Sequence, residues 1–205
     1  MLEVGVTLTA KVCGASGTEM CPPLTPTEAR SHFGAWCVVS SPLVLSFDFA
    51  NASLLDEHWA TVTNRDALAV NAAWAGASGS LFAAAEEVTT YTPCGFKRGS
   101  SCQWPSWWSW AKPLPATDAR GSVMAVLLMN NGDAPATLRF EFREVFGGRN
   151  VSACDVYDVW RRSAATHGRV SGGGFIAQNV QPRDSVFLTL SRCDPVLNGV
   201  AGLEV

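Results

Sequence analysis

The sequence predicts two kinds of structure in order along the chain, an α/β segment over residues 1–76 and an all-β antiparallel sandwich over residues 77–194. Two observations support the first part: a strong helix start near residue 25, and an apolar run at residues 43–49 between two helical patterns. A third supports the sandwich, because short strand-like runs punctuated by Gly, Ser and Pro follow residue 76. Residues 195–205 are expected to be a tail.

The first helix begins at Thr25-Pro26-Thr27-Glu28, a capping box with proline at the first helical position. The threonine side chain can accept from the glutamate amide, while the glutamate side chain reaches back to the cap amide. One face of this helix is then marked by residues at helical spacing, namely Ala29, Phe33, Trp36, Cys37 and Ser40, and Pro42 ends the pattern.

An almost unbroken apolar run follows at residues 43–49, which is typical of a strand buried on both faces. A second helix is expected over residues 53–61, with Ser53 as its cap and Asp56 three residues later. Two helices flanking such a strand form a βα unit.

The sandwich is expected to contain short antiparallel strands. In residues 138–143 three apolar side chains alternate with three charged ones, so one face of this strand should be buried and the other exposed to solvent. Residues 130–133 and 172–174 have the composition of hairpin turns. The expected strand-bearing runs are residues 80–91, 123–130, 136–146, 153–160, 168–177 and 185–191.

Composition excludes several classes of partner. The formal net charge is -3, from 15 basic and 18 acidic residues that are not clustered by sign, so nucleic acid is not an expected partner. No apolar run is long enough to cross a bilayer, and the first residues lack the pattern of a signal peptide. We expect no metal and no cofactor, since no close-spaced Cys or His pair of the metal-binding kind occurs.

The chain has 7 cysteines, a number typical of secreted proteins. Local bridges between Cys13 and Cys21 and between Cys94 and Cys102 are the economical pairing, which leaves Cys154 and Cys193 as a long-range pair and Cys37 as a buried thiol. Six cysteines allow about 15 pairings, so the connectivity stays open.

Two segments fit the acceptor pattern for N-linked glycosylation. They begin at Asn51 and Asn150. Together with the cysteines they indicate passage through the secretory route, although the first residues do not direct export.

Four short segments occur in an order and spacing that resemble the downstream half of the α-galactosidase and α-N-acetylgalactosaminidase type of glycoside hydrolase. The family patterns are D-P-D-M-L-E-V-G, R-x-H-F-x-x-W, A/S-P-L-L-x-x-x-D and N-x-x-V-I-A-V-N-Q-D. Their counterparts here are residues 1–5, 30–36, 41–48 and 67–71. The resemblance is close over residues 1–5 and 25–76 and looser from 110 to 191.

The resemblance implies that residues 1–76 are the C-terminal remnant of a TIM (β/α)8 barrel, with residues 6–24 as an inserted loop. It also implies that both catalytic aspartates of the family precede the counterpart of Met1, which is the only pocket-edge residue carried over. We therefore assign no catalytic residue and expect the 205-residue chain to be inactive. The parent protein would hydrolyse terminal α-galactosides with retention, in a secreted, vacuolar or lysosomal location.

Glu3 and Asp48 are the two carboxylates that could substitute for the family's aspartates, because residues at strand ends of a barrel face the active site. A carboxylate bonding loop amides is the better interpretation of both. His32 is expected to be a buried histidine bonded to the backbone rather than a base or a metal ligand.

Trp104, Trp107, Trp108 and Trp110 lie within seven residues, and flat aromatic faces stack on sugar rings. Packing in the core or at a domain interface is the favoured interpretation, since Trp110 matches a packing residue of the family. The alternative is a non-catalytic carbohydrate-binding module that uses Trp104, Trp107 and Trp108. The expected partner is thus an α-galactoside or another carbohydrate.

Overall fold

The computed structural model describes residues 3–6, 24–45, 48–91, 102–161 and 163–195. Its largest element is an antiparallel six-stranded sheet in the order β1-β4-β5-β10-β7-β8. Its strands are β1 (Ser80–Ala84), β4 (Trp107–Pro113), β5 (Ser122–Asn130), β7 (Val151–Asp158), β8 (Ser163–Ser171) and β10 (Ser185–Pro195).

Two small antiparallel sheets complete the β part. One pairs β2 (Val88–Tyr91) with β3 (Cys102–Pro105), and the other pairs β6 (Ala136–Glu141) with β9 (Gly174–Val180). A short helix, α4 (Phe142–Val145), follows β6 directly. The β-sandwich expected after residue 76 is therefore present.

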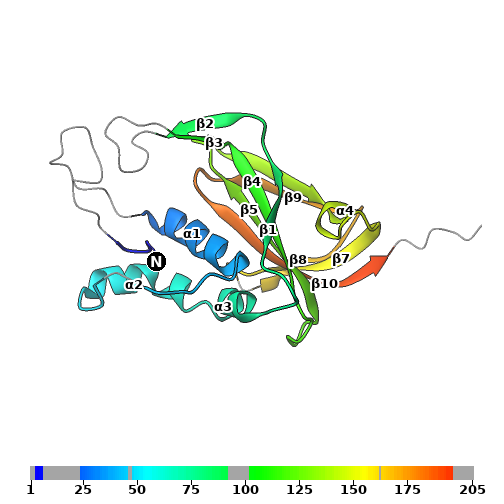
Figure 1. Cartoon of the computed structure of the whole chain (residues 1–205), viewed down its shortest axis with the longest axis horizontal. Helices are drawn as coiled ribbons and strands as arrows, with labels where there is room; N and C mark the ends of the chain where they lie inside the picture. The colour runs from blue at the N-terminus through cyan, green and yellow to red at the C-terminus, as the bar shows by residue number, and fades with distance from the viewer. Residues whose placement is uncertain (1–2, 7–23, 46–47, 92–101, 162, 196–205) are drawn as a thin grey trace, which may run out of the picture.

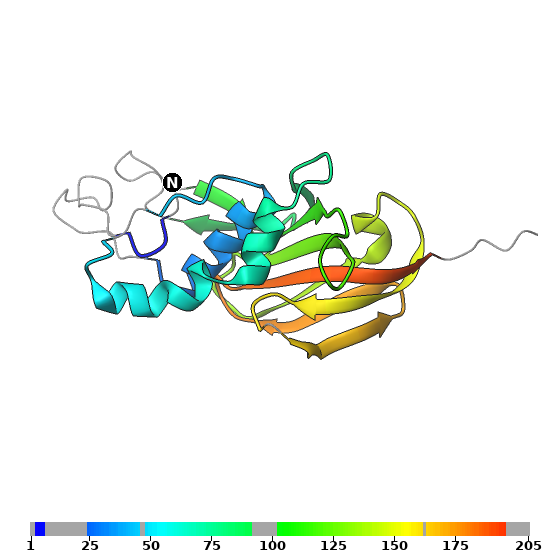
Figure 2. The ribbon, with the colours of Figure 1, turned by 90° about the horizontal axis from the view of Figure 1, so that it is seen from below.

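Three helices cover the other face of the large sheet: α1 (Pro26–Val38), α2 (Ala52–Val62) and α3 (Arg65–Ala72). Figure 1 shows α1 running along the sheet while α2 lies further out, and Figure 2 shows the helices gathered on one side of the strands. The fold thus has three layers, with the six-stranded sheet in the middle.

Strand β5 explains why the middle sheet is buried on both faces. Its sequence is apolar at nearly every position, and alternate residues enter different cores. Met124, Val126 and Leu128 pack between the sheets, against β6, β9 and α4. Ala125 and Leu127 pack on the helical side, against α1. The helices and the sandwich therefore share a core.

Helix α1 begins as the sequence predicted. Thr25 caps it, and both bonds of the capping box with Glu28 are present. Its buried residues include Ala29, Phe33 and Cys37, which lie on the face expected from the spacing.

The prediction of a strand at residues 43–49 is wrong, since the described residues of that segment form no strand. Leu45 forms only an isolated bridge, residues 46 and 47 lie outside the described part, and Val44 and Phe49 are 53% and 56% exposed. An apolar run predicts burial, but in the described part of this segment the pairing does not extend beyond the single bridge at Leu45.

The second helix is present, but Ser53 is not its cap. It starts at Ala52, because the Asn51 side chain accepts from the amide of Leu54 at 3.2 Å. Helix α3, which the sequence analysis did not predict, is capped by Asn64, whose side chain accepts from the amides of Asp66 and Ala67.

The prediction that two turns form β-hairpins is also wrong, because the strands on either side of each turn do not pair with each other. Residues 130–133 link β5 to β6, and residues 172–173 link β8 to β9, yet the members of each pair belong to different sheets. Turn composition predicts a change of direction without specifying which strands then pair. Phe142 is fully buried as expected, although it lies in α4 rather than in a strand.

Candidate functional site

Strands β3 and β4 carry the tryptophan cluster. Trp110 packs on the helical side of the sheet and Trp107 against the sandwich core. Alternation along β4 places Trp108 on the same side as Trp110. The ring of Trp108 stands edge-on to those of Trp104 and Trp110, with centroids 5.8 and 6.2 Å apart. These edge-to-face contacts are favourable packing arrangements.

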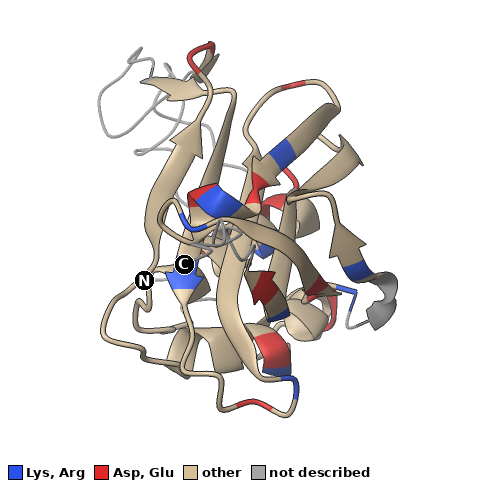
Figure 3. Ribbon diagram, turned by 90° about the vertical axis from the view of Figure 1, so that its right-hand side faces the viewer, with Lys and Arg blue, Asp and Glu red and all other residues tan. Residues whose placement is uncertain are grey.

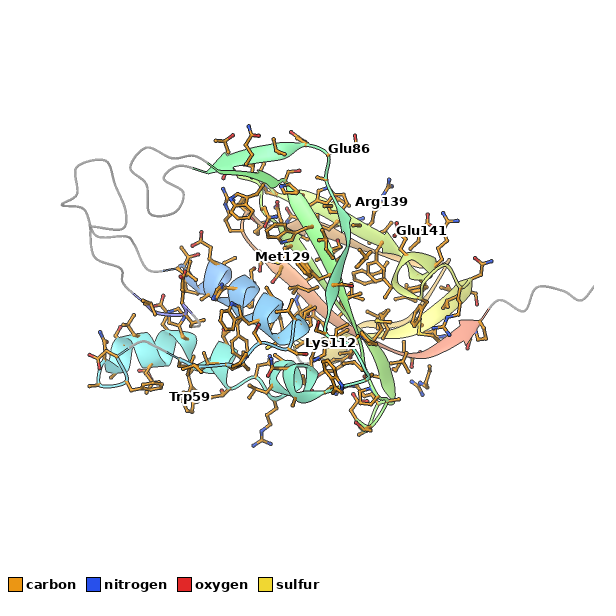
Figure 4. All side chains as sticks on the ribbon, in the orientation of Figure 1. Trp59, Glu86, Lys112, Met129, Arg139 and Glu141 are labelled. Carbon is orange, nitrogen blue, oxygen red and sulfur yellow. A yellow bond between two sulfur atoms is a disulfide. The ribbon has the colours of Figure 1, made fainter. Side chains whose placement is uncertain are left out.

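The surroundings differ among the three candidate sugar-stacking residues. Trp104 is 42% exposed, whereas Trp107 and Trp108 are half-buried. The Trp108 indole N–H donates to the sulfur of Met129 at 3.0 Å, so its polar group is used within the fold. Figure 4 shows Met129 between the sheet and α1. Trp104 has the most accessible ring surface of the three.

Trp107 also lines a groove of about 1250 Å³ that runs along β6 and β9. Arg139, Glu141 and Ser152 are among the polar residues on its walls. Figure 4 shows Arg139 and Glu141 on that side of the molecule. Both are exposed, and Arg143 holds Glu141 in an ion pair of 2.6 Å. The groove therefore combines aromatic residues, among them Trp107, Phe140 and Phe175, with polar ones.

Of the two candidate carboxylates, that of Asp48 makes a local backbone contact, whereas Glu3 bonds through its main-chain amide. The Asp48 carboxylate accepts from the amide of Ala50 at 2.9 Å, which holds the turn before α2. The amide of Glu3 donates to Nε2 of His32 at 3.2 Å. The prediction that His32 bonds to the backbone is thus confirmed, but the residue is half-buried rather than fully buried. Burial lowers the pKa of its imidazole, while the Glu3 carboxylate opposes that shift.

Met1 lies outside the described residues, as do the Cys13–Cys21 pair and Cys94, and the side chain of Cys102. Cys154 and Cys193 form a disulfide between β7 and β10. Cys37 is a free, buried cysteine, and burial raises the pKa of its thiol to about 12. Asn51 and Asn150 are both exposed.

Other features bear on the chemistry of the described chain. Within the described residues there is no group of three or more His, Cys, Asp or Glu side chains able to hold a metal ion. No helix in that part is long and apolar enough to span a membrane. Figure 3 shows acidic and basic residues interspersed along the strands, and Asp155, for example, pairs with both Arg169 and Arg192.

One buried residue was missed by the sequence analysis. Lys112 on β4 is 0% exposed, and its ammonium group donates to the carbonyl oxygens of Val70 and Asn71 at the end of α3. Burial lowers the pKa of the Lys112 ammonium. The lysine sits in a mostly apolar region of the sequence, but its partners are backbone groups that no side-chain pattern reveals.

The family model and the two plant proteins that match this chain all point to α-galactosidases. Residues 105–190 match the alpha galactosidase C-terminal beta sandwich domain. An α-galactosidase of Coffea arabica is 27% identical over 168 residues, which are 82% of this chain and 36% of that protein. Alpha-galactosidase 3 of Arabidopsis thaliana is 26% identical over 155 residues, covering 76% of this chain and 30% of that protein.

Solved structures share the fold. α-Galactosidase I from Mortierella vinacea matches with a TM-score of 0.61 at 17% identity, over 84% of this chain and 38% of that one. The α-galactosidase of Saccharomyces cerevisiae, solved with raffinose, has a TM-score of 0.61 at 17% identity, over 95% of this chain and 46% of that one.

Residues 105–190 are thus of the C-terminal β-sandwich type found in alpha galactosidases. The chain as a whole is similar to the C-terminal part of α-galactosidase, melibiase-like proteins. It spans about a third of the length of the two plant relatives.

Proposed function

We propose that the chain is the C-terminal part of an enzyme that hydrolyses terminal α-galactosides with retention. The observation that carries this proposal is the match of residues 105–190 to the α-galactosidase sandwich domain. In this proposal residues 1–76, with the inserted loop 6–24, are the end of a TIM barrel. Residues 77–194 are the sandwich, and residues 195–205 are a tail.

The outer surface of the helical layer supports the barrel assignment. Large apolar side chains are exposed on it. A surface with this many exposed apolar groups is expected to be covered by further protein structure. The exposed side chains are Val44, Phe49, Trp59 and Trp74. Figure 4 shows Trp59 pointing away from the sheet.

Catalysis in this proposal needs residues outside the chain. A retaining glycosidase places two carboxyl groups about 5 to 5.5 Å apart across the scissile bond. In the family that the sequence resembles, both aspartates precede the counterpart of Met1. Asp48 already accepts from the Ala50 amide, which supports a structural role for it. The 205-residue chain should therefore have no turnover.

Release of nitrophenol from a nitrophenyl α-galactoside by the purified chain tests this expectation. We expect a rate equal to that of buffer. Turnover that disappears in Asp48→Asn and survives in Asp56→Asn, an exposed aspartate of α2, would show that the chain carries its own catalytic carboxylate and would contradict the proposal.

A second candidate function is a non-catalytic carbohydrate-binding module. The exposure of Trp104 and the position of Trp107 in the groove along β6 and β9 favour it. Galactose should then quench tryptophan fluorescence in the chain, and the quenching should be lost in Trp104→Ala and Trp107→Ala. Trp74→Ala is the matched control, since Trp74 is 61% exposed on the helical layer.

The parent protein is proposed to follow the secretory route to the cell exterior, the vacuole or the lysosome. The exposed positions of Asn51 and Asn150 leave both open to glycosylation. A glycan on Asn51 is compatible with its capping role, because the cap uses the side-chain oxygen and the sugar attaches to the nitrogen. The bridges Cys13–Cys21 and Cys94–Cys102 remain predictions.

A further inference from the structure

The groove along β6 and β9 contains one of the two acceptor patterns for N-linked glycosylation. Asn150 lies on its wall, between α4 and β7, and Ser152, which completes the pattern, lies on the same wall. Both residues are exposed. A group attached to the Asn150 side chain therefore starts inside the groove.

The wall next to Asn150 has room for a bulky group. Gly172, in the turn between β8 and β9, lines the groove, and a Cβ atom placed there would have no other atom within 4 Å. This turn lies against the acceptor pattern, because the Gly173 amide donates to the Ser152 carbonyl oxygen at 3.1 Å. A sugar attached to Asn150 can therefore pass over the turn without meeting a side chain there.

Beyond the turn, the groove continues over the outer face of the sheet formed by β6 and β9. The register places Ile176 opposite Arg139, and the next outward-facing pair is Gly174 opposite Glu141. Ile176 is 61% exposed and lines the groove. Figure 4 shows Arg139 and Glu141 on this side of the molecule. An exposed apolar side chain thus lies between a guanidinium and the glycine turn.

These groups match the chemistry of N-acetylglucosamine, the first sugar of an N-linked glycan. Its acetamido methyl group and the C–H face of its ring are apolar and can pack on Ile176. Its hydroxyl groups can accept from the Arg139 guanidinium and donate to the Glu141 carboxylate. Ile176 lies four residues after Gly172, about 13 Å along an extended strand, which the asparagine side chain and two sugars can span.

We propose that Asn150 carries an N-linked glycan whose first two sugars lie in this groove and cover Ile176, instead of extending into solvent. The proposal rests on the secretory route proposed above. In the attachment step, Nδ2 of Asn150 forms a bond to the anomeric carbon of an oligosaccharide carried on a lipid diphosphate. The lipid diphosphate leaves, and the amide loses one proton. The attached glycan then fills the groove that an external carbohydrate would need.

The test uses the 205-residue chain secreted from yeast behind a signal peptide. We expect mass spectrometry of its glycopeptides to find a glycan on Asn150. NMR of the folded glycoprotein should show a nuclear Overhauser effect between the first acetamido methyl group and the methyl groups of Ile176.

Two variants locate the contact. Ile176→Ser should speed the release of the Asn150 glycan from the folded chain by peptide N-glycosidase about 5-fold, the effect of losing part of an isoleucine contact. Leu81→Ser is the matched control, since Leu81 is an exposed apolar residue of β1 that does not line the groove, and it should leave the rate unchanged. If Ile176→Ser fails to fold, the Overhauser effect in the wild-type chain decides alone.

The possible failures are distinguishable. A glycan on Asn51 with none on Asn150 overturns the proposal and leaves the secretory route standing. An Asn150 glycan that shows no Overhauser effect to Ile176, and is released equally fast in Ile176→Ser, overturns the placement in the groove. Absence of glycans at both sites overturns the proposal together with the secretory assignment. The nitrophenyl galactoside assay tests the hydrolytic activity separately.

Discussion

At the scale of single residues, Lys112 connects the helices to the sandwich. Its buried ammonium group satisfies two carbonyl oxygens at the C-terminal end of α3, where a positive charge also interacts favourably with the helix dipole. Lys112→Met keeps the approximate shape but leaves both carbonyl groups without this donor. We expect a loss of about 1–3 kcal/mol in the free energy of unfolding, measured by urea denaturation followed through tryptophan fluorescence.

Arg139→Met is the matched control, because it removes an exposed cation from β6. Exposed charges contribute little to stability, so this variant should unfold at nearly the wild-type urea concentration. Equal stability of the two variants would mean that the contact between Lys112 and α3 contributes nothing.

The contact between Glu3 and His32 should make stability depend on pH. His32 accepts from the Glu3 amide and must be neutral to do so, and burial lowers its pKa below the value of the unfolded chain. The stabilisation is therefore complete above about pH 6.5 and is lost as the pH falls through and below that value. His32→Gln retains an acceptor that does not titrate, so between pH 7.5 and pH 5 it should lose less stability than the wild type. Parallel losses in the two proteins would refute this role for His32.

At the scale of elements, α1 approaches the sheet closely at Gly34. A Cβ atom placed there would lie 2.8 Å from Cζ2 of Trp160 and 3.1 Å from Cδ1 of Leu127. Gly34→Ala gains about 1 kcal/mol of helix propensity but forces the helix away from the sheet, at a cost of about 1–3 kcal/mol. We expect a net loss of stability in thermal denaturation.

A double-mutant cycle separates these two effects. Trp160→Phe removes the ring atoms nearest to the new methyl group, so Gly34→Ala should cost less in that background than in the wild type. An additive pair of changes would show that the close approach at Gly34 does not limit the packing of α1.

The same elements show what the sequence could predict. The capping box at Thr25 and Glu28 is a local interaction, and the helix begins where it predicts. The alternation in β6 likewise identified the buried face. Pairing of strands is not local: residues 130–133 look like a hairpin turn, yet Asn130 donates to the carbonyl oxygens of Ala134 and Val180 and helps the chain cross between sheets.

At the scale of the whole molecule, the helical layer and the sandwich share one packed core across the expected boundary at residue 76. The residue pattern alone suggested a division at residue 76. The structure places Phe33 and Cys37 of α1 in the same core as Leu127 and Phe187 of the sheet, and Arg30 pairs with Asp184 at 2.6 Å. Separation of α1 would expose the sheet face that these residues cover.

Limited proteolysis with chymotrypsin should reveal this arrangement. Within the described residues of the range 24–91, the earliest cuts are expected after Phe49, Trp59 and Trp74, which are 56%, 55% and 61% exposed. Phe33 is 1% exposed and should be protected. Helix α2 buries only His58 and Val62 of its 11 residues, so little packing is lost when it opens. The nicked protein should elute as one species from a sizing column, since α1 remains bound through the shared core. A stable product that begins near residue 77, with α1 released early, would instead support two independent units and would require the boundary at residue 76.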